Sequence, residues 1–285
     1  MRFSGLFSLF FFTFVSLVLT TESWSASFQL SNKLIPGSAV LIHVKGFPEG
    51  STLKGDLDKR SFPLSADGLG IIALDMAKKE GYATVRVRIK PKKGAQETVS
   101  RKFWISPRPY KEEHITLPKK KVDLGKTDLT RANKETRAIK ATYNLRRDKP
   151  GYLEQFRQPL EGRFSGVFGS RRILNGKPKR PHNGVDIAAP KGTPIVTTAP
   201  GRVVLVGKDY FFTGNTLVIH HGDGVISLYA HMDEMLVEKG EWLSKDTVIG
   251  TIGMTGRVTG PHLHWGTLVR GARVDPMMMP GIRQP

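Results

Sequence analysis

The 285-residue chain contains no cysteine. This absence excludes disulfide bonds and thiolate metal ligands, so any metal site has to use histidine and carboxylate side chains. After residue 25, no apolar run approaches the roughly 20 residues that a membrane-spanning helix needs, which excludes a polytopic membrane protein. Acidic residues are also few, 25 against 44 lysines and arginines, and the formal charge of +19 predicts attraction to polyanions.

The chain begins with the features of a secretory signal peptide. Arg2 gives a positive start, residues 6–19 form an apolar stretch, and a small, polar tract with Ser23 and Ser25 follows. We expect a signal peptide over residues 1–25, cleaved near Ser25, and a protein exported to the periplasm or cell envelope. An uncleaved membrane anchor is the alternative, which we disfavour because a stretch of about 14 residues is short for a bilayer.

Short β-rich runs separated by turn residues dominate two parts of the chain. In residues 27–108, the alternation of apolar and basic residues from Thr84 to Ile89 is typical of a half-buried strand, and we expect an antiparallel β-sandwich. In residues 154–285, glycine-punctuated strands without helical periodicity predict a barrel-like β domain. The expected fold class is therefore mainly β, with two domains, as the chain length also favours.

A basic, polar segment over residues 109–153 links the two β regions. Within it, an apolar stripe with spacings of three and four predicts a helix that Thr127 or Asp128 would cap and Pro150-Gly151 would end. The stripe consists of Leu129, Ala132, Thr136, Ile139 and Tyr143. We expect this helix to pack on the domains rather than form a dimerising coiled coil, because the stripe covers barely two heptads.

Six of the eight histidines lie after residue 180. The first motif there is PHNGVDIAAP, in which His182 and Asp186 are four residues apart. Its prolines and Gly184 disfavour a helix, and on a straight strand the two side chains would be about 13 Å apart. Zinc ligands lie about 2.0 to 2.2 Å from the ion, so the chain has to bend at Asn183-Gly184 for both to bind it.

The second motif, GPHLHWG, carries two histidines on one expected strand. His262 and His264 would share a face about 6.6 Å apart, while Leu263 and Trp265 point into the core. Two buried imidazoles side by side need satisfied partners. We therefore expect both rings to lie in one cavity, where one can bind a metal ion and its neighbour can reach water or substrate.

The third motif, ISLYAHM, adds another histidine. His231 would share a strand face with Ser227 and Tyr229, and would thereby face the same cavity. His220 and His221 are adjacent and point to opposite sides of their strand, so we expect both to be structural or rim residues.

Two histidines and one carboxylate form the open coordination set of catalytic zinc. Zinc polarises a carbonyl group and lowers the pKa of its water, while other side chains must take a proton and stabilise the oxyanion. The chain has no HExxH motif to supply a glutamate base, which leaves His231 and His262 as candidates. The same donor set also occurs in non-haem iron oxygenases, the alternative enzyme class.

Taken together in order, the three motifs resemble the signatures of lysostaphin/LytM-type zinc metallopeptidases. HNGVD at 182–186, YAH at 229–231 and GPHLH at 260–264 are intact. The resemblance covers nearly half of the chain, from about Phe156 to Pro276. It implies one zinc ion per chain held by His182, Asp186 and His264, with His231 and His262 as the catalytic pair.

The resemblance also implies an activity. Members of this family hydrolyse peptide cross-links of bacterial peptidoglycan, so it implies an exported zinc metallo-endopeptidase that binds stem peptides and cross-links. Whether the cross-link joins D-amino acids or is a glycine bridge stays open, as does any restraint of the site by the amino-terminal region. A non-catalytic activator or binding protein of wall hydrolases is the alternative, although no ligand is missing here. We expect a monomer with no nucleic-acid partner and with peripheral contacts to anionic envelope polymers.

Overall fold

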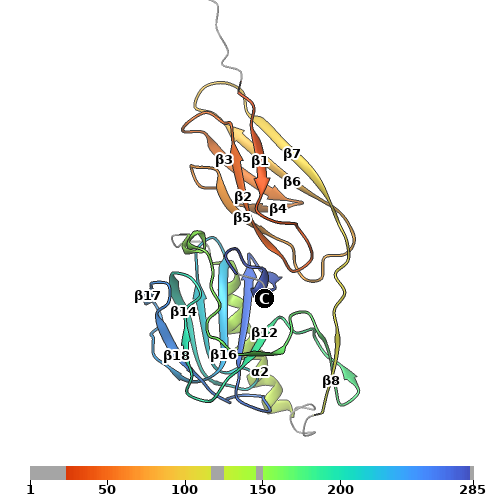
Figure 1. Ribbon diagram of the computed structural model, residues 1–285, viewed down its shortest axis with the longest axis vertical. Coiled ribbons are helices and arrows are strands. Elements are labelled where there is room, and N and C mark those ends of the chain that lie inside the picture. Colours follow the sequence, from red (N-terminus) through yellow and green to blue (C-terminus); the bar gives the residue numbers. More distant parts are fainter. Residues whose placement is uncertain (1–23, 117–124, 146–149, 283–285) are drawn as a thin grey trace, which may run out of the picture.

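The computed structural model describes residues 24–116, 125–145 and 150–282. The expected signal peptide falls almost wholly outside these ranges. Within them, no helix has the length and apolar character needed to cross a bilayer. Two β regions lie one above the other along the long axis of the molecule, with the amino-terminal region at the top in Figure 1. The expected mainly β fold class is confirmed.

The amino-terminal region is built from two antiparallel sheets. The smaller sheet contains β1 (Ser27–Leu30), β2 (Ala39–Lys45) and β5 (Leu69–Ala73), and the larger one β3 (Thr52–Leu57), β4 (Arg60–Phe62), β6 (Gly81–Lys90) and β7 (Glu97–Ile105). Ile42 of β2 packs with Val87 and Ile89 of β6 in one core, and all three side chains are fully buried. The expected sandwich is thus confirmed, and β6 has the alternation of buried and outward residues that its sequence predicts.

The carboxy-terminal region is built around one large antiparallel sheet. Its strands are β9 (Arg163–Gly166), β12 (Gly184–Ala188), β13 (Pro194–Val196), β14 (Gly201–Tyr210), β15 (Gly214–His220), β16 (Val225–Met235), β17 (Trp242–Leu243), β18 (Val248–Ile252), β19 (Leu263–Val269) and β20 (Ala272–Val274). The main strand order is β17-β14-β15-β16-β19-β12-β9. The sheet curls because β18 pairs with both β16 and β13, and it encloses a core that contains Tyr229 and Trp265. A short 3-10 helix, η3 (Pro276–Met278), follows.

Residues of the expected linker pack against this large sheet. Strand β8 (Glu112–Ile115) pairs in parallel with β10 (Arg171–Leu174), which also pairs with β11 (Lys177–Pro178). Helix α2 (Lys126–Ala141) follows, and then the 3-10 helices η1 (Thr142–Asn144) and η2 (Gly151–Glu154). Ile139 of α2 packs with Val218 and Leu268 of the sheet. The helix is therefore present where the sequence predicts it, and it packs on its own chain.

The predicted ends of α2 are wrong. The residue at the N-cap is Gly125, and no side chain caps the helix, so neither Thr127 nor Asp128 has that role. At the other end the helix stops at Ala141, well before Pro150, because a 3-10 turn begins there and the Thr142 hydroxyl donates a hydrogen bond to the Ile139 carbonyl at 2.7 Å. The apolar stripe is also only partly buried, since Leu129 is exposed.

The two β regions are joined by charged contacts. Arg273 of β20 donates to Asp75 of the amino-terminal region through Nη2 at 2.6 Å and through Nε at 3.0 Å. Arg108, which follows β7, donates to Asp275 at 2.6 Å. Each pair joins a residue of one region to a residue of the other. Apolar residues of both regions, including Ile71 and Val274, also share one buried cluster.

Two adjacent histidines lie inside the carboxy-terminal region. His220 and His221 are both fully buried, in agreement with a structural role. His221 Nδ1 lies 2.8 Å from the Pro200 carbonyl oxygen, and its Nε2 lies 2.7 Å from the Ser227 hydroxyl. Burial lowers the pKa of His221 from 6.5 to about 4, so the folded protein keeps this imidazole neutral.

This buried imidazole predicts an acid-sensitive fold. Because the pKa of His221 is lower in the folded than in the unfolded state, its stabilising contribution is full above pH 6.5 and is lost as the pH falls towards about 4. The contribution at stake is about 3 kcal/mol of unfolding free energy. The variant His221→Gln should lose correspondingly less stability over this interval. Urea unfolding of both proteins in chelator, at several pH values, measures the difference, and parallel pH profiles would contradict the prediction.

Candidate metal centre

Three side chains from two segments converge beside strands β12 and β19 of the large sheet. His182 Nε2 and His264 Nδ1 lie 3.0 and 2.8 Å from Asp186 Oδ1, and 2.9 Å from each other. The register of β12 with β19 pairs Asp186 directly with His264, whereas His182 precedes β12, which begins at Gly184. The chain therefore turns at Asn183-Gly184, where β12 begins, and this brings His182 close to Asp186. The ligand atoms all lie within 4.8 Å of one another, close enough for one metal ion.

Two glycines let the backbone come close enough for this convergence. A Cβ atom on Gly184 would lie 2.4 Å from the Trp265 carbonyl oxygen and 2.8 Å from His264 Cε1. A Cβ atom on Gly166 of β9 would lie 2.4 Å from Asp186 Oδ2. No side chain fits at either position without moving a ligand, so both glycines are required by close packing rather than by an unusual backbone conformation.

Neighbouring groups direct one donor atom of each side chain to the common point. His182 Nδ1 lies 3.0 Å from the Val167 carbonyl oxygen, which accepts its proton and leaves the lone pair of Nε2 for a metal ion. Arg172 donates to Asp186 Oδ2 at 2.7 Å, so Oδ1 is the oxygen that faces the two imidazoles. Two imidazole nitrogens and one carboxylate oxygen form a donor set that zinc favours.

The protonation states also suit a cation. Burial alone would raise the pKa of Asp186, but the adjacent imidazoles of His182 and His264 outweigh it and hold that pKa well below the ordinary value. Burial lowers the pKa of His264 to about 4. An ionised carboxylate and a neutral imidazole are the forms that bind metal ions, so no proton has to be displaced from these two groups near neutral pH.

The remaining two motif histidines lie beside the three converging side chains. The rings of His231 and His262 have centroids 4.8 Å apart, and the His231 ring is 6.2 Å from that of His264. His262 Nε2 lies 3.9 Å from Asp186 Oδ1. The structure therefore brings all five expected site residues into one cluster.

Both of these rings are held through Nδ1. His231 Nδ1 lies 2.9 Å from the Thr255 carbonyl oxygen, and His262 Nδ1 lies 2.9 Å from that of Gly260. With the proton on Nδ1, Nε2 of each ring keeps its lone pair. Burial and the neighbouring imidazoles of His264 and His262 lower the pKa of His231 to about 3, so this ring is neutral at physiological pH.

The expected strand geometry of His231 is wrong. It was predicted to face the cavity together with Ser227 and Tyr229, but Tyr229 is fully buried in the core, and the residue that pairs with His264 is Ala230. Regular alternation would therefore turn His231 away from the site. Instead, His231 has φ of 64°, a left-handed conformation that is rare outside glycine and that reverses the alternation. The sequence of the motif does not indicate the left-handed conformation at His231.

Sequence reasoning also missed two charged residues behind Asp186. Arg172 Nε lies 3.5 Å from Glu113 Oε2, and the parallel register of β8 with β10 places these two residues opposite each other. A strand from the linker thus supplies a carboxylate to the arginine that holds a metal-facing aspartate. Glu113 and Arg172 are far apart in the sequence, and no spacing rule connects them.

This contact predicts an effect on metal affinity. The variant Arg172→Gln should bind zinc about 10- to 100-fold more weakly, because Asp186 Oδ2 loses the charged donor that orients the carboxylate. The neighbouring Arg171→Gln is the matched control, since Arg171 is exposed and lies 4.0 Å from Glu112. Competition with a chromophoric chelator measures both affinities. Equal affinities in the two variants would show that the contact does not support the metal centre.

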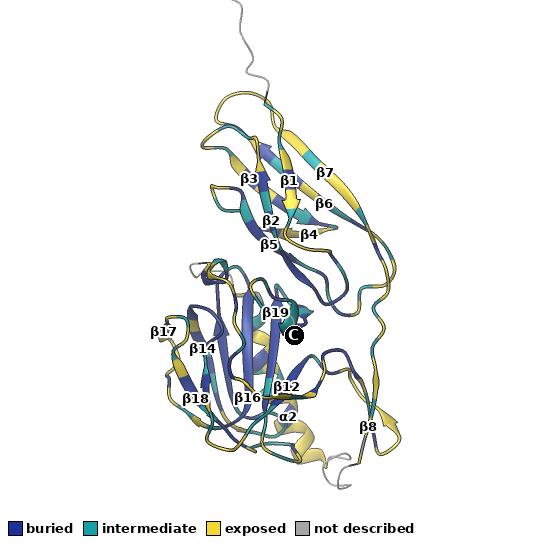
Figure 2. Ribbon diagram, viewed as in Figure 1, coloured by how far each residue is buried: buried dark blue, intermediate teal, exposed yellow. Residues whose placement is uncertain are grey.

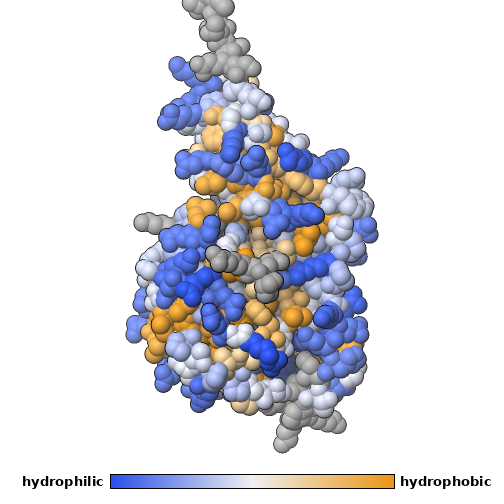
Figure 3. Space-filling model, in the orientation of Figure 1, coloured by the Kyte–Doolittle hydropathy of each residue, from blue (hydrophilic) through white to orange (hydrophobic). Residues whose placement is uncertain are grey.

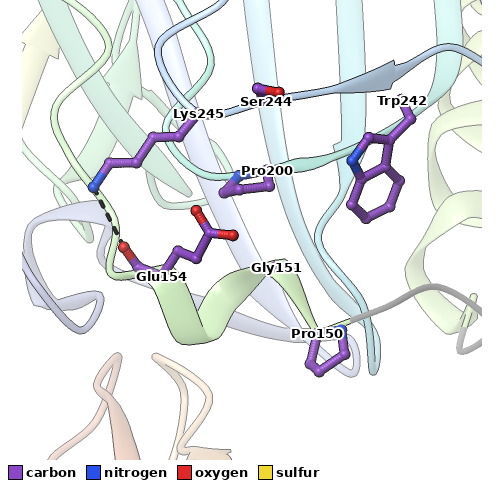
Figure 4. Close-up of a pocket in the computed structure, with 7 residues that line it drawn as sticks. All are labelled: Pro150, Gly151, Glu154, Pro200, Trp242, Ser244 and Lys245. Carbon is purple, nitrogen blue, oxygen red and sulfur yellow. Dashed lines mark hydrogen bonds between the residues drawn. The ribbon is translucent and has the colours of Figure 1, made fainter.

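A separate cavity of about 330 Å³ lies outside the metal centre. It is lined by Pro150, Gly151, Glu154, Pro200, Trp242, Ser244 and Lys245 (Figure 4). Lys245 Nζ donates to the Glu154 carbonyl oxygen at 3.3 Å, and this bond closes one side of the cavity. None of the five histidine and aspartate residues of the metal centre borders it.

Comparison with known proteins places this cluster in a family. The sequence model of Peptidase family M23 matches residues 180–276, a range that contains all five clustered residues. This segment of the chain belongs to peptidase family M23. Among its relatives, the peptidoglycan DD-endopeptidase ShyA of Vibrio cholerae is 35% identical over 204 residues, which are 58% of this chain and 46% of ShyA. The matched part of this chain thus covers slightly less than half the length of ShyA.

Two further relatives bear on the interpretation. The crystal structure of an M23 protein from Pseudomonas aeruginosa superposes with a TM-score of 0.66 at 28% identity, over 88% of this chain and 97% of that one, so the likeness includes both β regions. The murein hydrolase activator NlpD of Escherichia coli is 35% identical over 125 residues, 44% of this chain and 31% of NlpD. The match of residues 180–276 to a peptidase family argues against the iron oxygenase alternative.

Proposed function

We propose that this chain is an exported zinc metallo-endopeptidase that hydrolyses peptide cross-links of bacterial peptidoglycan. The convergence of the His182, Asp186 and His264 donor atoms, with two further imidazoles beside them, carries this proposal. Membership in family M23 and the description of the Vibrio relative as a peptidoglycan DD-endopeptidase support it. That description favours cross-links between D-amino acids over glycine bridges.

In this proposal, zinc is held by His182 Nε2, His264 Nδ1 and Asp186 Oδ1. When bound, zinc supplies a Lewis acid that polarises the scissile carbonyl and lowers the pKa of water. Arg172 keeps Asp186 Oδ2 occupied, so the aspartate offers one oxygen and leaves room for solvent and substrate. The second carboxylate oxygen would otherwise compete for that position.

His231 and His262 handle the proton and the developing charge. One imidazole accepts the proton of the attacking water at Nε2, and the other donates a hydrogen bond to the oxyanion of the scissile carbonyl when its own Nε2 also carries a proton. Their carbonyl partners fix both rings through Nδ1. Each ring therefore presents Nε2 as its reactive atom.

Peptidoglycan lies in the cell envelope, and we place the mature protein there as a monomer in the periplasm, after removal of residues 1–25. Digestion of purified, cross-linked peptidoglycan by zinc-loaded protein tests the activity. Mass analysis of the released muropeptides should show cross-linked dimers converted to monomers cut at a D-amino-acid bond. Unchanged dimers would overturn the proposal, and stimulation of a separate wall hydrolase by the same inert protein would favour the activator alternative that NlpD represents.

A further inference from the structure

The outer face of the four-stranded sheet in the amino-terminal sandwich carries an exposed aromatic pair. Tyr82 of β6 pairs across the strands with Trp104 of β7, and their rings meet edge to face with centroids 5.0 Å apart. Their exposed fractions are 63% and 53%. Large rings are normally buried, and tyrosine and tryptophan that stay exposed together are typical of binding surfaces.

Basic residues share this face with the aromatic pair. Alternation in β3, β6 and β7 places five cations on it: Lys54, Arg86, Arg88, Lys90 and Lys102. On these three described strands the register gives the face one carboxylate, Asp56, which forms an ion pair with Arg88 at 2.5 Å. We call the seven residues Tyr82, Trp104 and these five cations the aromatic-basic face. Its field attracts a partner with repeated negative charges.

The aromatic-basic face is extended and leads towards the metal-bearing region. Strand β7 runs down the amino-terminal sandwich, and its exposed length is clear in Figure 2. Tyr82 and Trp104 lie where β6 begins and β7 ends, just before the segment that continues to β8 and its contact with Arg172. Hydrophilic residues cover much of the visible surface of both regions (Figure 3). A long ligand lying along β7 would therefore be directed towards the peptidase sheet.

We propose that the aromatic-basic face binds peptidoglycan strands as a second, non-catalytic contact with the polymer. The choice of polymer rests on the proposed function. The apolar faces of sugar rings stack on aromatic side chains, and the carboxylates of stem peptides pair with lysine and arginine. A membrane surface fits less well, because membrane-binding elements insert apolar side chains from protruding helices, whereas these rings lie within a regular ladder.

Sedimentation with insoluble peptidoglycan tests this contact. The full mature chain is mixed with purified sacculi in chelator, so that binding is measured without cleavage. Tyr82→Ala with Trp104→Ala, and separately Arg86→Ala with Lys102→Ala, should each weaken binding about tenfold. The control is Lys33→Ala with Lys93→Ala, which removes the same charge from exposed turns outside the face and should change binding less than about twofold. Thermal unfolding verifies that each variant is folded.

Three results would overturn the proposal. The aromatic variant could bind as well as the unmodified protein, or the control could lose as much binding as the basic variant, which would indicate general charge attraction. The face variants could instead lose binding to anionic phospholipid vesicles while keeping full binding to sacculi, which would make the partner a membrane. Zinc-loaded variants should cut a soluble cross-linked muropeptide dimer at the unmodified rate. Failure of the unmodified protein to cut that dimer would overturn the proposed function and leave the binding result standing.

Discussion

Alanine variants of His182, Asp186 and His264 are expected to lose both zinc and peptidoglycan hydrolysis. Each replacement removes one of three protein donor atoms that lie within 4.8 Å of one another, and two donors hold zinc far more weakly than three. Without zinc there is no polarised carbonyl and no activated water, so hydrolysis should fall by at least about 1,000-fold. Metal analysis after gel filtration and muropeptide release from the same samples measure both losses.

Asp186→Asn sharpens this test. Asparagine keeps the size of the side chain and a possible contact with Arg172, but it removes the negative charge that offsets the ion. It should therefore lose zinc nearly as fully as the alanine variant. Chelated wild-type protein is the reference for folding, and added zinc should restore activity to it but not to the variants. Retention of one zinc per chain with full hydrolysis in any of them would overturn the assignment of that ligand.

The sequence predicted the metal centre better than the groups that support it. His182, Asp186 and His264 lie in motifs whose order and spacing are specific, and the pairing of β12 with β19 brings Asp186 opposite His264. Arg172 and Glu113 could not be found in this way. They meet only because a linker strand pairs in parallel with β10, and long-range strand pairing has no local sequence signal.

The same limit applies to backbone geometry and helix ends. The apolar stripe predicted helix α2 correctly. The N-cap residue is Gly125, however, and no side chain caps the helix, so Thr127 and Asp128 do not have the predicted capping role. His231 lies in the cluster as predicted, but the alternation rule wrongly grouped it with Tyr229, which lies in the core, because the rule assumes a regular strand. The left-handed backbone at His231 is imposed by the surrounding structure, whose Thr213 carbonyl accepts the His231 N–H at 2.8 Å.

Replacement of His231 is expected to stop turnover while zinc stays bound. The ring is not among the three converging donors, and its centroid is 6.2 Å from that of His264. Loss of a positioned proton-transfer group should lower kcat by about 100- to 10,000-fold and change KM little. Both His231→Ala and His231→Asn should be measured, because asparagine tolerates the left-handed conformation at this position better than alanine does.

The pair of variants separates chemistry from folding. If backbone strain alone mattered, the asparagine variant would recover stability and activity together, whereas a lost imidazole leaves both variants inactive at any stability. His221→Gln serves as a control, since His221 is also a buried histidine but its ring nitrogens contact Pro200 and Ser227, outside the cluster. It should retain zinc and hydrolysis near neutral pH. Full turnover in the His231 variants would remove this residue from the mechanism, and loss of zinc would move its role to the metal centre itself.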